Sequence, residues 1–175
     1  MFAVLEKWQK EGFNLEERLK RTKGPFIEIG GPTLGGYDMV DIENLERKLH
    51  VSNLCQGAPK IREGGILLEG KVDFQADGRM LPFRDNSLGA MFVSCLGNIK
   101  THPYFKKYYD ECLREKIIRD SFRALEQGGL LVWQGCKNQD VEFAENIGFK
   151  VLKYSGLSNI PYFYCVFEKQ ILIKN

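Results

Sequence analysis

Short apolar segments alternate with longer amphipathic segments along most of this chain, and this alternation constrains the fold more than any other feature. The most apolar segment is AMFVSC at 90–95, where hydrophobic residues stand side by side instead of at every second position. Such a run is typical of a strand that is buried on both faces of a parallel sheet. Other short apolar segments predict further strands at 26–29, 49–52, 72–76, 130–134, 149–154 and 162–169.

The longer segments between the predicted strands indicate helices. The clearest is 108–125, where apolar residues recur at helical spacing and Gly128-Gly129 follows as a stop signal. Weaker patterns predict one or two helices within 2–22, interrupted at Gly12, and further helices at 37–48 and 140–146. The glycine-rich segment 57–71 predicts a connection with at most a short helix or a hairpin around Gly64-Gly65.

Strands that alternate with helices form a mostly parallel sheet with helices on both faces and right-handed crossovers. We therefore predict an α/β fold, a three-layer sandwich around a seven-stranded sheet. The last two strands are joined without room for a helix, so the seventh is expected to run antiparallel beside the sixth. With 175 residues, the chain is expected to form one domain over 1–175, with 1–24 as an amino-terminal helical extension.

Composition and charge argue against several classes of protein. Twenty-five Lys and Arg stand against 23 Asp and Glu, so nucleic acid is not implied as a partner. No apolar run approaches the ~20 residues that span a bilayer, and the amino terminus is charged too early for a secretory signal. We therefore expect a cytoplasmic protein outside the membrane. The five cysteines form no close pair, which favours reduced thiols, and no Cys or His pair has zinc spacing.

A glycine-rich segment, 30–36, follows directly after the first predicted strand. In open parallel sheets ligands bind outside the carboxyl ends of the strands, and glycine lets backbone amides approach a ligand without a Cβ in the way. A glycine cluster alone, however, more often forms only a tight turn between a strand and a helix.

Four segments, taken in order, make the functional reading more specific. They are FIEIGG at 26–31, DGRMLPFRDNSL at 77–88, the apolar strand up to Leu96, and RDSFRALEQGGLL at 119–131. Together they resemble the Rossmann-like (class I) S-adenosylmethionine-dependent methyltransferases of the type 11 kind, with a divergent glycine motif. The resemblance extends from 26 to 169. It implies the Rossmann-like methyltransferase fold, S-adenosyl-L-methionine as cofactor and methyl transfer to an unidentified acceptor.

The resemblance also implies which residues hold the cofactor: Glu28, Gly30, Gly31, Asn53, Asp77, Gly78, Arg79, Met80, Cys95 and Leu96. Glu28 would fix the glycine turn and face the methionine end of the cofactor, and the glycine pair would pass close beneath it. Asp77 would accept a hydrogen bond from the adenine amino group, and the three residues after it would flank the ring. Cys95 and Leu96 would form the floor of the transfer site.

Alternatives remain for some of these roles. Asp77 before Gly78 is also typical of an Asx turn, and Cys95 is equally suited to core packing. Methyl transfer needs no dedicated catalytic residue, because the methyl group is already activated. If the acceptor needs a base, His102 is the best-placed candidate, although a lone histidine beside a proline is more often a surface or packing residue.

Two positions depart from the family's pattern. Asn53 stands at the end of the second strand, where the family has a carboxylate that accepts both ribose hydroxyls; an amide has one acceptor oxygen and no charge. Pro32 stands inside the glycine turn, where it fixes φ and removes an amide donor. Asp38, Asp41 or Glu43 could supply a replacement carboxylate.

These departures keep other hypotheses open. In the second hypothesis, the chain is a degenerate methyltransferase-fold protein that acts as a non-catalytic binding or regulatory subunit. A different dinucleotide-binding enzyme is a third, because a glycine turn is shared across Rossmann-like folds. The chain has little beyond the sheet to build a lid, so the amino-terminal helices, the acceptor, a partner subunit or a second copy is expected to complete the site.

Overall fold

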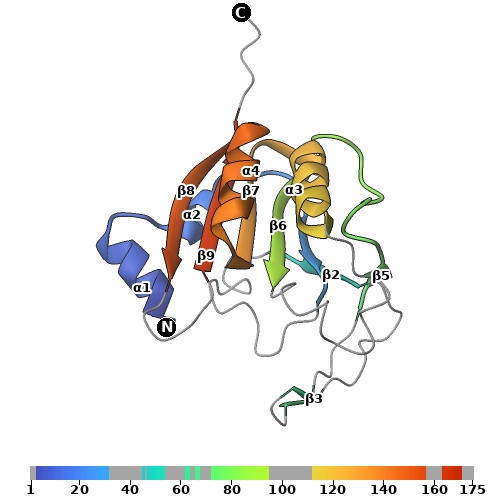
Figure 1. Cartoon of the computed structure of the whole chain (residues 1–175), viewed down its shortest axis with the longest axis horizontal. Coiled ribbons are helices and arrows are strands. Elements are labelled where there is room, and N and C mark those ends of the chain that lie inside the picture. Colours follow the sequence, from blue (N-terminus) through green and yellow to red (C-terminus); the bar gives the residue numbers. More distant parts are fainter. Residues whose placement is uncertain are drawn as a thin grey trace, which may run out of the picture.

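The computed structural model describes residues 3–31, 45, 47–53, 62–63, 66–67, 72–94, 112–156 and 163–170. Its helices are α1 (Ala3–Lys10), α2 (Leu15–Arg21), α3 (Leu113–Ala124) and α4 (Asn138–Asn146). Its strands are β1 (Phe26–Ile29), β2 (Leu49–Asn53), β3 (Arg62–Glu63), β4 (Ile66–Leu67), β5 (Phe74–Gln75), β6 (Leu88–Ser94), β7 (Leu125–Cys136), β8 (Phe149–Gly156) and β9 (Phe163–Lys169). All strands except β3 and β4 belong to one sheet (Figure 1).

The large sheet has seven strands in the order β5-β2-β1-β6-β7-β9-β8. The strands from β5 to β7 in this order are parallel to their neighbours, whereas β9 is antiparallel to both β7 and β8. This confirms the predicted α/β sheet with an antiparallel last strand. The segment 157–162 is too short for the crossover helix that a parallel β9 would need. The position of β9 between β7 and β8 was not predicted.

Two hydrophobic cores lie on the two faces of the sheet, because alternate residues of each strand point to opposite faces. On β6, Ala90 and Phe92 belong to the core that α1 and α2 cover, while Met91 and Val93 belong to the core that α3 and α4 cover. In Figure 1, α3 and α4 lie in front of the sheet and α2 lies behind it. The predicted three-layer sandwich is confirmed, and burial on both faces explains the continuous apolar run of β6.

The two amino-terminal helices are separated at Gly12, whose φ is +78°, as the pattern in 2–22 predicts. Both helices are held against the sheet by large buried side chains, among them Trp8, Leu15 and Leu19. The indole nitrogen of Trp8 also donates a hydrogen bond to the hydroxyl of Ser155 in β8. The first two helices therefore share a core with the sheet.

The boundary between α3 and β7 differs from the prediction. The helix ends at Ala124, and Leu125 is already extended and pairs with Leu88 of β6. Gly128, with φ +75°, lies inside β7, where the space for a Cβ is open. The helix thus ends one residue before the predicted end at 125. Gly128-Gly129 do not cap it, but lie in the irregular part of β7 between the pairs Leu88–Leu125 and Ala90–Leu130.

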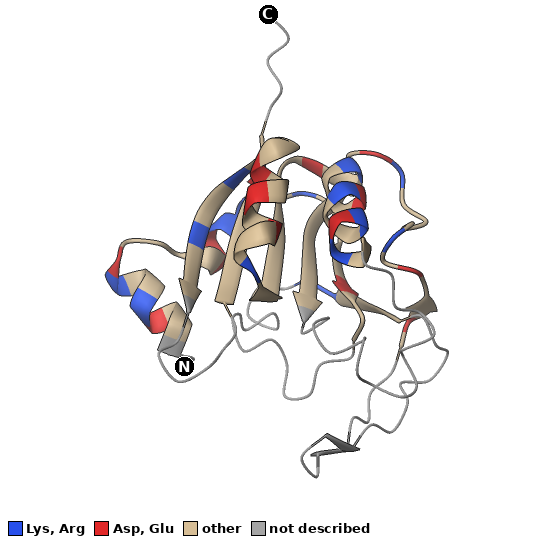
Figure 2. Ribbon diagram, viewed as in Figure 1, with Lys and Arg blue, Asp and Glu red and all other residues tan. Residues whose placement is uncertain are grey.

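The remaining elements agree with the prediction where they are described. β3 and β4 pair antiparallel around 64–65, which confirms the predicted hairpin. Most of the predicted helix at 37–48 and residues 108–111 of the predicted helix at 108–125 lie outside the described residues. In the described part of the chain, no helix is long and apolar enough to cross a membrane. Basic and acidic residues are interspersed on α3 (Figure 2).

Candidate functional site

The carboxyl ends of β1 and β2 are tied together by hydrogen bonds. The amides of Gly30 and Gly31 both donate to the carbonyl of Ser52, at 2.9 and 3.1 Å. The Ser52 hydroxyl donates to the carbonyl of Glu28 at 2.7 Å. Gly30 has φ +80°, a conformation that residues with a Cβ disfavour. The chain therefore turns sharply at the sheet edge where ligands bind in open parallel sheets.

Glu28 is only 2% exposed although it carries a carboxyl group. This carboxyl group packs against Gly31 so closely that a Cβ at Gly31 would overlap it. Any larger residue at position 31 would therefore displace the Glu28 side chain. The packing couples Glu28 to the shape of the glycine turn, while its role toward the methionine end of a cofactor stays a prediction.

Asn53, at the end of β2, uses its amide group to bridge the two strand ends. Its Nδ2 donates to the carbonyl of Gly31 at 2.6 Å, and the side chain is buried. A carboxylate could not donate this hydrogen bond. The departure from the family's pattern therefore has a structural role here, and Oδ1 is the only acceptor atom that the side chain can offer to a ligand.

Asp77 lies in a tight turn after β5. The amide of Met80 donates to the Asp77 carbonyl at 2.9 Å, and the amide of Arg79 donates to Asp77 Oδ1 at 2.9 Å. The Asx turn that sequence reasoning kept as an alternative is therefore present. The Arg79 guanidinium also donates to both carboxylate oxygens, at 2.5 to 2.9 Å. These charge-assisted hydrogen bonds hold the carboxylate in one orientation, and each of its oxygens can accept more than one hydrogen bond.

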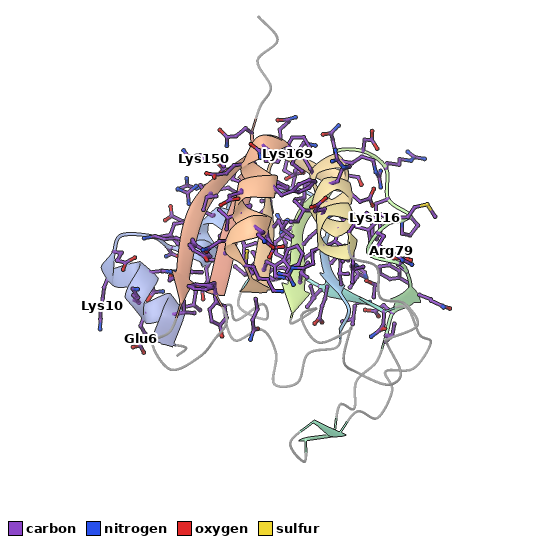
Figure 3. The ribbon with its side chains drawn as sticks, in the orientation of Figure 1. Glu6, Lys10, Arg79, Lys116, Lys150 and Lys169 are labelled. Atoms are coloured by element: carbon purple, nitrogen blue, oxygen red, sulfur yellow. The ribbon has the colours of Figure 1, made fainter. Side chains whose placement is uncertain are left out.

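The Asp77 turn is packed directly on the end of β1. A Cβ at Gly78 would lie 2.7 Å from Cγ2 of Ile29 and 3.4 Å from Cδ1 of Ile117 in α3. Glycine at this position thus lets the turn approach the strand and the helix. Figure 3 shows Arg79 near the end of β5, and Met80 is 79% exposed.

The structure therefore brings eight of the ten predicted site residues to the carboxyl ends of three adjacent strands, β5, β2 and β1: Glu28, Gly30, Gly31, Asn53, Asp77, Gly78, Arg79 and Met80. The other two, Cys95 and Leu96, lie outside the described residues, as do His102 and Pro32. Within the described residues, no group of three or more Cys, His, Asp or Glu side chains could hold a metal ion.

A second polar cluster at the same sheet edge was missed by sequence reasoning. It is formed by Arg114 of α3, Trp133 of β7 and Asp140 of α4, and we call it the Arg114 cluster. Arg114 Nε donates to Asp140 Oδ1 at 2.8 Å, and Nη2 donates to Asp140 Oδ2 and to the Gly135 carbonyl, the latter at 2.8 Å. The guanidinium lies over the Trp133 ring, 4.8 Å from its centroid. Its members are far apart in the sequence, so no local pattern predicts the cluster. The sequence predicts only that a helix begins at Asp140.

Two buried donors in the Arg114 cluster have no acceptor among the described residues. They are Nη1 of Arg114 and Nε1 of Trp133. Nearby, burial raises the pKa of the Cys165 thiol, and burial likewise raises the pKa of Tyr154. Both groups therefore stay protonated at neutral pH and supply neither a thiolate nor a phenolate.

The two specific motifs of the sequence contact each other near the other end of α3. Arg123 donates to the carbonyls of Leu81 and Phe83, at 3.0 and 2.7 Å, and Asp120 accepts from the Leu81 amide at 2.6 Å. Hydrogen bonds to Asp120 and Asp85 raise the pKa of Arg123 above its ordinary value. These contacts hold the segment between β5 and β6 against α3, so the joint occurrence of the motifs reflects a structural contact.

No family model and no curated protein sequence matches the chain. Similarity is found among solved structures. A TehB-like SAM-dependent methyltransferase from Corynebacterium glutamicum is 17% identical, with 94% of each chain covered and a TM-score of 0.54. The PH0226 protein from Pyrococcus horikoshii is 10% identical, with 96% of this chain and 91% of that chain covered and a TM-score of 0.60.

A SAM-dependent methyltransferase from Methanosarcina mazei is 11% identical, with 98% of this chain and 99% of that chain covered and a TM-score of 0.52. At such low identities the likeness concerns the fold. The seven-stranded sheet, the antiparallel β9 and the helices on both faces agree with it. The chain therefore has the Rossmann-like fold that is found in these SAM-dependent methyltransferases.

Proposed function

We propose that the protein is an S-adenosyl-L-methionine-dependent methyltransferase of the type 11 kind, with a divergent glycine motif, that acts on an unidentified acceptor. The observation that carries the proposal is the packing of Gly78 against Ile29. This contact puts the Asp77 turn beside the glycine turn and the end of β2. The presence of the same fold in SAM-dependent methyltransferases supports the proposal.

The residues at this edge fit the polar groups of the cofactor. The Asp77 carboxylate, oriented by Arg79, would accept a hydrogen bond from the adenine amino group. Oδ1 of Asn53 would accept from a ribose hydroxyl, more weakly than a carboxylate would. The glycine turn at Gly30 and Gly31 would let the methionine part approach the backbone.

The chain's part in catalysis would be alignment and exclusion of water. The bound cofactor would supply a methyl group already activated by the sulfonium charge. The glycine turn and the Asp77 turn would hold the cofactor at two ends, which limits its orientations relative to an acceptor. Cys165 and Tyr154 stay protonated and do not act as bases. For an acceptor that must lose a proton, His102 is the base that the sequence proposes.

Calorimetry with S-adenosylmethionine and S-adenosylhomocysteine tests the proposal. Asp77→Asn keeps the shape of the side chain but removes its charge, and we expect it to weaken binding about 10- to 100-fold, as for the loss of a charge-assisted hydrogen bond. Asp85→Asn is the matched control, because Asp85 is 67% exposed and contacts Arg123 away from this edge. A folded chain that binds neither ligand at millimolar concentration, or equal affinities in the two variants, would contradict the proposal.

A non-catalytic binding or regulatory subunit is the second candidate, and Asn53 is the observation that favours it. The Asn53 amide, whose Nδ2 is bonded to the Gly31 carbonyl, has one uncharged acceptor oxygen for the ribose hydroxyls, whereas a carboxylate would have two charged ones. Turnover by the isolated chain with a cell extract as the source of acceptors, lost in Asp77→Asn, would exclude this candidate. In both proposals the site would be completed by the amino-terminal helices, the acceptor, a partner subunit or a second copy.

The organisation of the chain and its location are also proposals. The core that α1 and α2 share with the sheet supports a single domain over 1–175, in which 1–24 cover one face. Cys136 and Cys165 are buried thiols outside any disulfide, which suits the reducing cytoplasm.

A further inference from the structure

The Arg114 cluster contains more hydrogen-bond donors than the described residues use. Trp133 is fully buried, and the side chains of Arg114 and Asp140 are 16% and 6% exposed. Buried polar groups are nearly always hydrogen-bonded, so an unpaired buried donor requires an explanation. Here two such donors, Arg114 Nη1 and Trp133 Nε1, occur in side chains that touch each other.

The surrounding contacts hold both donors in place. Nε and Nη2 of Arg114 are bonded to Asp140 and to the Gly135 carbonyl, which fixes the plane of the guanidinium. Asp140 is fixed in turn by the Lys137 amide, which donates to it at 2.6 Å at the start of α4. The hydrogen bonds of Nε and Nη2 therefore fix the direction in which Nη1 points. Binding groups in proteins are typically held in place by neighbouring residues in this way.

The other tryptophan of the chain shows what a bonded buried indole looks like in the same fold. Trp8 Nε1 donates to the Ser155 hydroxyl, so this buried indole has an acceptor within the chain. Trp133 has none among the described residues. The unpaired nitrogen of Trp133 is therefore a feature of its own position and not of every buried indole in this fold.

The Arg114 cluster lies on the same face of the sheet as the Asp77 turn. Ile29 pairs with Val93, and Val93 pairs with Trp133, so the three residues form one row across β1, β6 and β7. At the usual strand spacing, Trp133 lies about 10 Å from Ile29, on which the Asp77 turn rests. Arg114 also lies about one helical turn before Ile117, which contacts that turn. A cofactor held at Asp77 would therefore have the Arg114 cluster beside it.

The chemistry of the two donors limits what they can bind. A guanidinium and an indole N–H donate hydrogen bonds and accept none, so their ligand must offer an acceptor oxygen. Asp140 already balances the charge of Arg114, so the oxygen can belong to a neutral carbonyl or to a carboxylate. On the same row, Tyr154 pairs with Cys165 next to Trp133, and Tyr154 stacks on Phe163, which is 38% exposed, with 4.8 Å between the ring centroids. Such a stacked pair favours a planar apolar body on the ligand.

We propose that Arg114 Nη1 and Trp133 Nε1 bind the carbonyl or carboxylate oxygen of an aromatic or similarly planar methyl acceptor. That the ligand is a methyl acceptor rests on the proposed function. The binding of an oxygen at the two donors can be measured without the cofactor. An acceptor held there would lie beside the Asp77 turn, where a cofactor is expected.

Nuclear magnetic resonance tests the inference directly, because the chain contains only two tryptophans. Three probes share one ring: benzoate, benzamide and benzylammonium, the last of which has no acceptor oxygen. In a proton–nitrogen correlation spectrum, benzoate and benzamide are expected to shift the indole signal of Trp133 and to leave that of Trp8 in place. Benzylammonium is expected to shift neither. Equal shifts with all three probes, or none at Trp133, would overturn the inference.

Two conservative variants separate binding from structure. Trp133→Phe removes an unpaired N–H and keeps an aromatic, though smaller, side chain; we expect the fold to persist and benzoate or benzamide to bind about fivefold to tenfold more weakly. Trp8→Phe removes a bonded N–H on the opposite face of the sheet and is expected to leave probe binding unchanged. Unchanged probe binding in a folded Trp133→Phe would contradict the inference.

Binding of S-adenosylhomocysteine, measured on the same samples, keeps the two proposals distinguishable. Probe binding without cofactor binding would support the oxygen site and count against the methyltransferase. Cofactor binding without any oxygen-dependent probe shift would support the methyltransferase and overturn the oxygen site.

Discussion

The two ends of the parallel strands differ in how they use their polar groups. At the amino end, Lys169 Nζ donates to Asn86 Oδ1 at 2.7 Å and to the Leu125 carbonyl at 2.8 Å, and Arg123 binds two carbonyls and two carboxylates. At the carboxyl end, Arg114 and Trp133 each keep a buried N–H that has no acceptor among the described residues. Figure 3 places Lys169 at the upper end of the sheet and Arg79 lower, near β5.

The difference shows which end of the sheet serves the fold and which has groups left for a ligand. The amino-end contacts attach the segment before β6 to α3 and to β9. Their removal should cost free energy of unfolding and little binding. At the carboxyl end, removal of a polar group should weaken ligand binding and cost little free energy of unfolding, because polar groups that folding does not use are typical of binding sites.

Substitution of glycine should give the largest contrast between the two ends. A Cβ at Gly24 would overlap backbone atoms of 87–89, which cannot move aside, so Gly24→Ala should lower the free energy of unfolding by at least about 3 kcal/mol. For Gly31→Ala the nearest atoms belong to the flexible Glu28 side chain, so the change should cost about 1–3 kcal/mol, while abolishing binding of S-adenosylhomocysteine. Urea denaturation and calorimetry measure the two effects. A smaller loss of stability in Gly24→Ala than in Gly31→Ala would break the comparison.

The two Arg–Asp pairs provide a second contrast. Arg123→Leu removes the hydrogen bonds to two carbonyls and leaves Asp120 with the Leu81 amide but without the balancing charge, so we expect a loss of about 2–3 kcal/mol in the free energy of unfolding. Arg79→Leu removes a pair that lies within one turn and is partly exposed, and its loss should stay within about 1 kcal/mol. Chemical denaturation of both variants checks this. Equal losses would mean that the Asp77 turn is as structural as the amino end.

One substitution, asparagine to aspartate, should act oppositely at the two ends. Asn53→Asp loses the donor to the Gly31 carbonyl and places a carboxylate against it, so we expect a loss of about 1–2 kcal/mol in the free energy of unfolding. Asn86→Asp keeps the oxygen that accepts from Lys169 and adds an opposite charge, so its stability should be unchanged or higher. Thermal unfolding of both variants at neutral pH distinguishes them. A stable Asn53→Asp that binds S-adenosylhomocysteine more tightly would show that Nδ2 is not needed to hold the turn.

The smallest expected effect is a dependence on pH. Burial lowers the pKa of Lys169 from its ordinary value of 10.5, so the unfolded chain binds more protons at this group than the folded chain between the lowered and the ordinary value. The stability of the natural protein relative to Lys169→Met should therefore rise as the pH increases through that window. Paired denaturation curves at neutral and alkaline pH measure the change. A relative stability that falls with pH would contradict the assigned direction.

Much of the architecture is predictable from local patterns. The consecutive apolar residues of 90–95 indicate a strand buried on both faces, and α1 and α2 divide at Gly12 as expected. The lack of room for a helix before β9 correctly predicts its antiparallel direction. These features depend on the period of apolar residues and on chain length, which the sequence displays directly.

Other features depend on contacts that no local pattern specifies. β7 begins at Leu125, before the strand predicted at 130–134, because Leu125 pairs with Leu88, and no local apolar pattern shows this pairing. The hydrogen bonds from the Arg79 guanidinium to both carboxylate oxygens of Asp77 are likewise seen only in the structure. The Asx turn itself was predictable from Asp77 and Gly78. The cofactor and catalytic roles of all the predicted site residues, Cys95, Leu96 and His102 included, stay predictions.

By itself, then, the sequence determined the succession of the described strands and helices along the chain, the two-sided burial of the sheet and the segments that meet at its carboxyl edge. Only the tertiary structure decided that Asn53 donates to Gly31 and that Arg114, Trp133 and Asp140 form one cluster. The physical reason is the difference in sequence separation between the residues involved. Apolar periodicity is a property of neighbouring residues, whereas a hydrogen bond between distant residues depends on where the packed elements place the donor and the acceptor.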